Sequence, residues 1–249
     1  MKVLLTSSFR YMGNFFIQSL GISNKKDLTC LFVGYALEDE IHINMCKDVL
    51  RNCLSIKEMI DLNENYKFKD KIDLVFVNGG ITNDLIKKLC EYNQLDKIRK
   101  LVMEDGAIYI GESCGSDYAG DYSNYSLLPD FSKDNNIEKK YGKKAYSGFK
   151  FINKFILTHA CKYRVRRMED GSYYRSHYGD QYKNYLKYLK ILKTNKIDFE
   201  TIANNEALLI TDKNYKKLKY DWSKFPIKKL ELTEHEKKLK EIVQSQRNS

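Results

Sequence analysis

The residues with the clearest chemical potential form the pattern Gly-x-Ser-x-Gly, which runs from Gly111 to Gly115 with Ser113 at its centre. The apolar residues 107–110 precede it and predict a buried strand that enters a sharp turn. Small residues on both sides let the backbone fold tightly, which exposes the serine hydroxyl above the sheet. The amide of the next residue, Cys114, can then bind an oxyanion, so the pattern predicts a serine nucleophile for acyl transfer.

A serine nucleophile needs a general base, and the chain has only four histidines to provide one. His159 directly follows an apolar run that predicts a strand. It would therefore lie at the carboxyl end of a strand, as Ser113 does, and we expect it to take the proton from Ser113. A histidine that merely caps a strand is the alternative interpretation.

Strands and helices that alternate along the chain would position these residues. Apolar runs bounded by turn signals predict strands at residues 3–6, 30–33, 59–62, 72–77 and 107–110. Helical patterns lie at residues 14–20, 38–54, 84–92 and 94–103. This alternation predicts an α/β fold with a mostly parallel sheet, in which ligands bind beyond the carboxyl ends of the strands.

The second half of the chain has weaker patterns. We expect a long connection at residues 117–148, a strand at 149–158, a loop at 160–178, a helix at 180–192 and a final strand pair at 198–203 and 207–211. Thr233 and Glu236 fit a capping box, which predicts a basic C-terminal helix at about residues 233–246. No linker is evident, so residues 1–249 are expected to form a single α/β domain.

Composition excludes several classes of protein. The chain is 249 residues long and 43% hydrophobic, which is too large and too apolar for a disordered tail or a disulfide miniprotein. Its net charge of +10 invites a nucleic-acid interpretation, but 35 of the 43 basic residues are Lys. Because Asn, Ile and Tyr are plentiful as well, coding bias explains the charge better, and we expect no nucleic-acid partner.

Location and cofactors can also be predicted. No run reaches the roughly 18 apolar residues of a membrane helix, and no cleavable signal is evident, so no membrane partner is expected. The six cysteines are scattered without a Cys-x-x-Cys pair, which favours reduced thiols in a cytoplasmic protein. The chain has no His-Glu-x-x-His motif and no cysteine cluster, so neither a metal nor another cofactor is expected.

Several motifs together resemble one known family. Residues 108–116 are similar to the Tyr-Ile-Gly-x-Ser-Ala-Gly-Ser elbow of the dipeptidase E family of serine peptidases. Residues 1–8 resemble its opening strand, 75–82 its Gly-Gly-Asn-Thr loop, 157–160 its Pro-His-Tyr-like motif and 202–207 its late acidic turn. The resemblance covers most of the chain and implies a three-layer αβα sandwich of the class I glutamine amidotransferase-like (flavodoxin-like) type.

The resemblance also assigns roles to residues. Ser113 matches the nucleophile, His159 the base, and the amides of Gly80 and Cys114 the oxyanion hole. The family implies a serine peptidase that forms an acyl-enzyme, and its best-known members cut small peptides with N-terminal aspartate. A nucleophilic Cys114 is disfavoured, because the motif places residue 113 at the tip of the turn.

The third member of the triad departs from the family pattern. Asn204 aligns with the family's carboxylate, and it can orient an imidazole but stabilises imidazolium less well. Glu206 is the alternative orienting group if the register slips by two residues, and it could equally be a solvated turn residue.

The expected substrate-binding residues depart from the family as well. Ile81, beside Thr82, replaces the family's Asn and cannot donate or accept a side-chain hydrogen bond. The arginine of the aspartyl-specific branch is missing from its expected place, and Arg167 or Arg175 could replace it as a carboxylate ligand.

The function expected from these features is a dipeptidase E-type hydrolase, with an N-terminal acidic residue as one option for its substrate. The alternative is a catalytically weak or inactive member that binds a ligand or a partner. The expected partner is a small peptide or amide substrate, and a homodimer is left open.

Overall fold

The computed structural model describes residues 1–22, 24–36, 40–63, 71–127, 135–161, 163–167, 173–177, 180–212 and 214–221. The C-terminal helix expected at residues 233–246, with its cap Thr233, lies outside the described residues. The organisation of residues 1–249 as one domain therefore stays a prediction.

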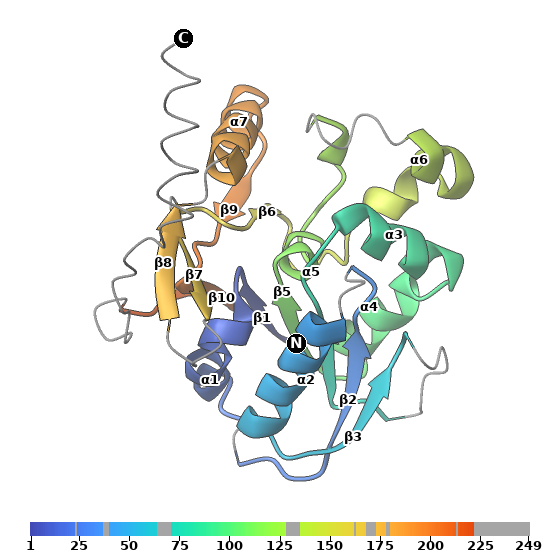
Figure 1. Ribbon diagram of the computed structural model, residues 1–249. Helices are drawn as coiled ribbons and strands as arrows, with labels where there is room; N and C mark the ends of the chain where they lie inside the picture. Colours follow the sequence, from blue (N-terminus) through green and yellow to red (C-terminus); the bar gives the residue numbers. More distant parts are fainter. Residues whose placement is uncertain are drawn as a thin grey trace.

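A seven-stranded sheet forms the centre of the molecule (Figure 1). Its strands are β1 (Lys2–Thr6), β2 (Leu28–Val33), β3 (Ile56–Asp61), β4 (Leu74–Val77), β5 (Ile108–Glu112), β10 (Glu206–Thr211) and β11 (Tyr215–Lys219). They lie in the order β11-β10-β1-β5-β4-β2-β3. The five strands from β1 to β3 pair in parallel, and β10 and β11 are antiparallel, which confirms the mostly parallel sheet.

Helices cover both faces of this sheet (Figure 1). They are α1 (Phe9–Ser19) and α2 (Glu40–Cys53) on one face, with α3 (Thr82–Glu91) and α4 (Leu95–Met103) on the other. Successive side chains of a strand point to opposite faces, so within β1 the side chain of Leu4 packs toward α1 and α2, whereas Val3 and Leu5 pack toward α3 and α4. The result is the expected three-layer αβα sandwich.

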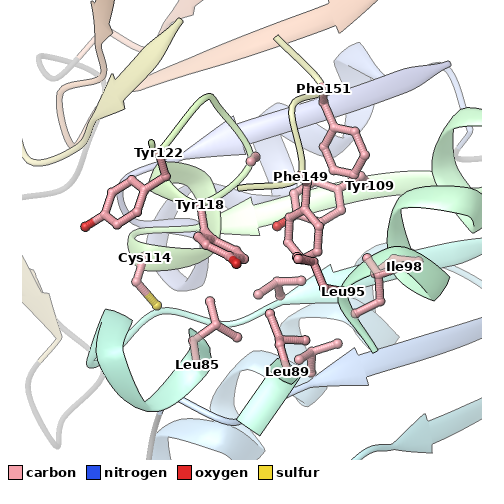
Figure 2. Packing of buried hydrophobic residues seen from close by; sticks show 14 of the residues in the cluster. Leu85, Leu89, Leu95, Ile98, Tyr109, Cys114, Tyr118, Tyr122, Phe149 and Phe151 are labelled. Atoms are coloured by element: carbon pink, nitrogen blue, oxygen red, sulfur yellow. The ribbon is translucent and has the colours of Figure 1, made fainter. Parts of the chain in front are cut away.

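The core on the α3 and α4 side also fixes the turn after β5. Tyr109, Tyr118, Phe149 and Phe151 pack there with ring centroids 4.8–5.6 Å apart (Figure 2). The hydroxyl of Tyr109 donates to the carbonyl of Gly115 at 2.7 Å. A fully buried aromatic cluster therefore holds the segment that follows the strand.

The remaining elements are short. They are α5 (Cys114–Asp117), the 3₁₀ turns η1 (Tyr125–Leu127) and η2 (Lys143–Tyr146), α6 (Asn135–Tyr141), β6 (Phe155–Leu157), β7 (Tyr163–Arg167), β8 (Tyr173–His177), α7 (Asp180–Thr194) and β9 (Phe199–Thr201). The connection at residues 117–148 thus contains local helices. The strand predicted at residues 149–158 shrinks to β6, because the amides of Phe149 and Phe151 donate to Tyr118 and Ala119 instead of to a ladder.

Two further predictions about the second half were wrong. Residues 160–178 are not simply a loop, since β7 and β8 form an antiparallel pair in which Arg167 faces Tyr173. The strands expected at residues 198–203 and 207–211 do not pair with each other: β9 pairs with β6, and β10 pairs with β1 and β11. A turn closed by the amide of Glu206 on the carbonyl of Ala203 separates the two strands.

None of the helices in the described part of the chain combines the length and the apolar character needed to cross a membrane.

Candidate active site

The turn after β5 holds Ser113 in a strained conformation. Its φ of 49° and ψ of −114° lie where residues with a Cβ are rarely found. A Cβ on Gly111 would lie 2.8 Å from the backbone of Gly115, and a Cβ on Gly115 would lie 2.3 Å from the carbonyl oxygen of Val77. The amide of Ser113 donates to Thr6 of β1 at 2.8 Å. The tight turn thus requires glycine on both sides of the serine.

Three side chains form a continuous hydrogen-bonded series. Ser113 Oγ lies 2.8 Å from His159 Nε2, and His159 Nδ1 lies 3.0 Å from Asn204 Oδ1. An amide oxygen only accepts hydrogen bonds, so this contact places the ring proton on Nδ1. Nε2 is then left as the acceptor for the hydroxyl proton of Ser113.

The backbone of His159 is held by residues beyond the ends of β1 and β6. Its φ is 57°, and its amide donates to Ser7 Oγ at 3.0 Å. The Ser7 hydroxyl in turn donates to the carbonyl of Ile202 at 2.6 Å. The same carbonyl accepts from the amide of Ala160. These bonds connect the histidine segment to the segment that carries Asn204.

Of the two candidates for the orienting group, Asn204 is the one whose side chain contacts Nδ1. Asn204 is only 2% exposed, so its orientation is fixed by packing. The carboxylate of Glu206 accepts from the amide of Ala203 at 3.0 Å and closes the turn before β10.

The loop after β4 packs directly against the serine. A Cβ on Gly79 would lie 3.0 Å from Ser113 Cβ, and a Cβ on Gly80 would lie 2.0 Å from the carbonyl oxygen of Ala36. Gly80 has a φ of 139°, which disfavours any other residue there. The amide of Ile81 donates to Ala36 at 2.9 Å and fixes the loop.

The thiol of Cys114, beside the serine, is buried. Its Sγ donates to the carbonyl of Asn78 at 3.4 Å. Burial raises the pKa of the Cys114 thiol well above its usual range, and nearby carboxylates raise it further. A protonated thiol is a weak nucleophile, so the local chemistry favours the serine.

A cavity of about 360 Å³ opens at this point. It is lined by Gly80, Thr82, Ser113, Cys114, Asp117, Leu157, Thr158, His159, Asn184, Tyr185 and Tyr188. Five of the residues expected from the sequence are therefore brought together: Gly80, Thr82, Ser113, Cys114 and His159. Within the described ranges, no group of His, Cys, Asp and Glu is arranged to hold a metal.

Other residues expected at the site lie elsewhere or outside the description. Ile81 is 61% exposed and is absent from the cavity wall, although it adjoins Gly80. Arg167 and Arg175 lie on β7 and β8, and their side chains fall outside the described part of the structure.

Comparison with known proteins identifies the family. Residues 4–218 match the model of peptidase family S51. This chain belongs to peptidase family S51. It is also 30% identical, over 127 residues, to a Drosophila melanogaster protein named as a probable alpha-aspartyl dipeptidase. That match covers 47% of this chain, which spans about half (52%) of the length of that relative.

Solved structures confirm the fold of this S51 chain. A Listeria monocytogenes EGD-e protein named as a peptidase E candidate has a TM-score of 0.60 at 20% identity, over 88% of this chain and 98% of its own. A peptidase from an acI-B1 Actinobacterium has a TM-score of 0.53 at 17% identity, over 88% and 87% of the two chains. The match of residues 4–218 to the family model confirms the resemblance to the dipeptidase E family.

Asp117 and the residues of α7 were not identified from the sequence as part of the cavity beside Ser113. Asn184, Tyr185 and Tyr188 lie at helical spacing on one face of α7, a pattern visible in the sequence. Asp117 is four residues after Ser113, which also places it one helical turn away. Spacing alone does not tell which helix face meets the cavity, and that depends on tertiary packing.

Asp117 is held by two hydrogen bonds from one residue. Its Oδ1 accepts from the amide of Thr158 at 3.0 Å, and its Oδ2 accepts from the hydroxyl of Thr158 at 3.2 Å. Burial raises the pKa of Asp117 to about 7, although both hydrogen bonds act in the opposite direction. Near neutral pH this carboxyl therefore exists in both protonation states.

This raised pKa predicts a pH-dependent stability. Between about pH 4 and pH 7 the folded protein keeps a proton on Asp117 that the unfolded chain has lost, so Asp117 lowers stability as the pH rises. The variant Asp117→Asn does not titrate at this position. The difference in the free energy of unfolding, variant minus wild type, should therefore be on the order of 4 kcal/mol larger at pH 8 than at pH 4. Urea unfolding of both proteins at both pH values measures this difference. If the variant and the wild type differ by the same free energy of unfolding at pH 4 and at pH 8, the prediction is wrong.

Proposed function

We propose that this S51 chain is a serine peptidase that cleaves small peptides through an acyl-enzyme. Ser113 is the nucleophile, His159 the general base, and Asn204 the group that orients the imidazole. The observation that carries the proposal is the 2.8 Å contact between Ser113 Oγ and His159 Nε2 at a strained strand-to-helix turn. Membership of a peptidase family adds support.

The proposed reaction has two halves. His159 Nε2 takes the proton of Ser113 Oγ as the oxygen attacks the peptide carbonyl, and the amides of Gly80 and Cys114 stabilise the oxyanion. The protonated imidazole then gives its proton to the leaving amine. In the second half, His159 activates a water molecule that hydrolyses the ester on Ser113.

The cavity supports a small substrate in this proposal. Its volume of about 360 Å³ is at the lower end of ligand sites, which favours a short peptide over a protein chain. Thr82 is proposed to contact the substrate, with Ile81 beside the entrance. Cleavage after an acidic residue would need Arg167 or Arg175 to reach the cavity, and this remains a prediction.

A neutral phosphonylating probe tests the proposal. A fluorophosphonate should form a covalent adduct on Ser113 of the wild type, detectable by mass spectrometry, because the activated Oγ attacks phosphorus as it would a carbonyl. Ser113→Ala should abolish the adduct, whereas Ser123→Ala, which removes an exposed serine, should not. If the folded wild type is not labelled, the peptidase proposal is wrong.

The second candidate function is a ligand-binding member of the family with little or no turnover. The neutral Asn204 favours it, because the imidazolium formed in the reaction then lacks a carboxylate partner at Nδ1. Failure of labelling with an intact cavity would support this candidate.

A cytoplasmic location belongs to the same proposal. All six cysteines are free thiols in the structure, which suits a reducing compartment.

A further inference from the structure

In the described part of the cavity wall, the charge differs from what an acidic substrate requires. Among the described residues that line the cavity, Asp117 is the only one with a carboxylate, and none is Lys or Arg. A substrate carboxylate would therefore meet a like charge there, and a substrate cation would meet an opposite one.

The carboxylate of Asp117 is preorganised. Thr158 fixes both of its oxygens, at 3.0 and 3.2 Å, and each oxygen has a second lone pair that can accept another hydrogen bond. Since the orientation is already fixed, little conformational entropy would be lost when a ligand binds.

Asp117 is also close to the reacting centre. Its amide donates to the carbonyl of Ser113 at 2.9 Å, so the two residues are one helical turn apart. Side chains at this spacing have Cβ atoms about 5–6 Å apart. A peptide whose carbonyl lies at Ser113 Oγ would therefore bring its own amine or side chain within reach of Asp117.

The surroundings of Asp117 add further negative charge. Asp117, Glu112 of β5 and Asp84 of α3 all raise the pKa of the Cys114 thiol. Asp117 likewise raises the pKa of the Tyr122 hydroxyl, which packs on the same side. Beside these groups, His159 is the only cavity-lining residue of the described part that can become cationic.

We propose that Asp117 is a specificity-determining residue that binds an ammonium group of the substrate, so that the chain acts on peptides with a positive charge at the residue that acylates Ser113. This inference deepens the proposed peptidase function and rests on it for turnover, but not for binding. Leu157, Tyr185 and Tyr188 complete the wall and can contact the methylene groups of a basic side chain.

The test measures ligand binding to a variant that cannot turn over substrate. In a Ser113→Ala background, calorimetry compares lysinamide with its Nα-acetyl, Nε-acetyl and doubly acetylated forms at pH 7, where the free amines of the ligands are mainly protonated. Lysinamide should bind at least about tenfold more tightly than the doubly acetylated form, because only its ammonium groups can form a largely desolvated ion pair with Asp117. Adding Asp117→Asn should remove this preference, while adding Asp84→Asn, a nearby acid outside the cavity wall, should leave most of it.

The singly acetylated ligands distinguish the two sources of the ammonium group. If the preference persists with Nα-acetyl-lysinamide, Asp117 binds the side chain, and if it persists with Nε-acetyl-lysinamide, Asp117 binds the α-amine. Binding of whichever form is preferred should strengthen from pH 6 to pH 7 by a larger factor in the parent than in Asp117→Asn, because only the ionised carboxylate attracts a cation.

The outcomes separate this inference from the proposed function. If the doubly acetylated ligand binds as well as lysinamide, or if Asp117→Asn leaves the preference intact, the inference about Asp117 is overturned, even if Ser113 is labelled by a fluorophosphonate. If the preference is present and depends on Asp117 but Ser113 is not labelled, the inference stands and the peptidase proposal fails.

Discussion

Replacing His159 by alanine is expected to slow the labelling of Ser113 by a fluorophosphonate by about a thousandfold or more. In the wild type, His159 Nε2 lies 2.8 Å from the hydroxyl and accepts its proton. Without the imidazole, the hydroxyl must react at its ordinary pKa, at which it is a poor nucleophile. Mass spectrometry of intact protein over time gives the second-order rate constant of labelling.

Two controls show whether this loss is chemical or structural. Free imidazole should partly restore labelling in His159→Ala, because the cavity beside Ser113 has room for it, and should have no effect on Ser113→Ala. When turnover of a peptide substrate is measured, Ser113→Ala and the double variant Ser113→Ala/His159→Ala should be almost equally inactive. The effects of substitutions on the rate are not additive when the residues act as a unit. A labelling rate within tenfold of the wild type would remove His159 from the mechanism.

Replacing Asn204 by aspartate is expected to accelerate labelling and turnover by about tenfold or more, since a carboxylate at Nδ1 stabilises the imidazolium that the reaction forms. The Oδ1 atom already lies 3.0 Å from Nδ1, so the new carboxylate inherits the correct position. The pKa of His159 should rise in this variant, which an NMR titration of the imidazole can follow. Asn204→Ala should instead lower the rate, because the ring loses its orientation.

Glu206 provides the matched control for Asn204. The variant Glu206→Gln removes the carboxylate that closes the turn, so it should reduce stability more than it reduces the rate of labelling. If Glu206→Gln slows labelling strongly and Asn204→Asp leaves it unchanged, Glu206 would be the orienting group and the assignment of Asn204 would be wrong.

Most of the parallel sheet was predictable because several of its strands contain continuous apolar runs. β4 and β5 are buried on both faces, so hydrophobicity alone identifies them. The strands β7 and β8 were not predictable, because Tyr163–Arg167 is short and contains three arginines, and both strands are defined by backbone pairing with each other. Local sequence carries little information about a ladder of that kind.

The site divides in the same way. The positions of Ser113 and His159 follow from local signals, namely a glycine-flanked turn and the end of a strand. The choice between Asn204 and Glu206 depends on which side chain of a tight turn faces the ring, which only the three-dimensional structure shows. Asp117 was missed because its partner, Thr158, is 41 residues away in the sequence.

The hydroxyl of Ser7 has a mechanical consequence for the site. Ser113 follows β5 of the seven-stranded sheet, whereas His159 and Asn204 follow β6 and β9, which form a separate two-stranded sheet. Ser7 accepts from His159 and donates to Ile202, so this one side chain fastens the small sheet to the end of β1. Because the preceding residue, Thr6, accepts from the amide of Ser113, the nucleophile, the base and the segment of the orienting residue are all anchored to two consecutive residues at the end of β1.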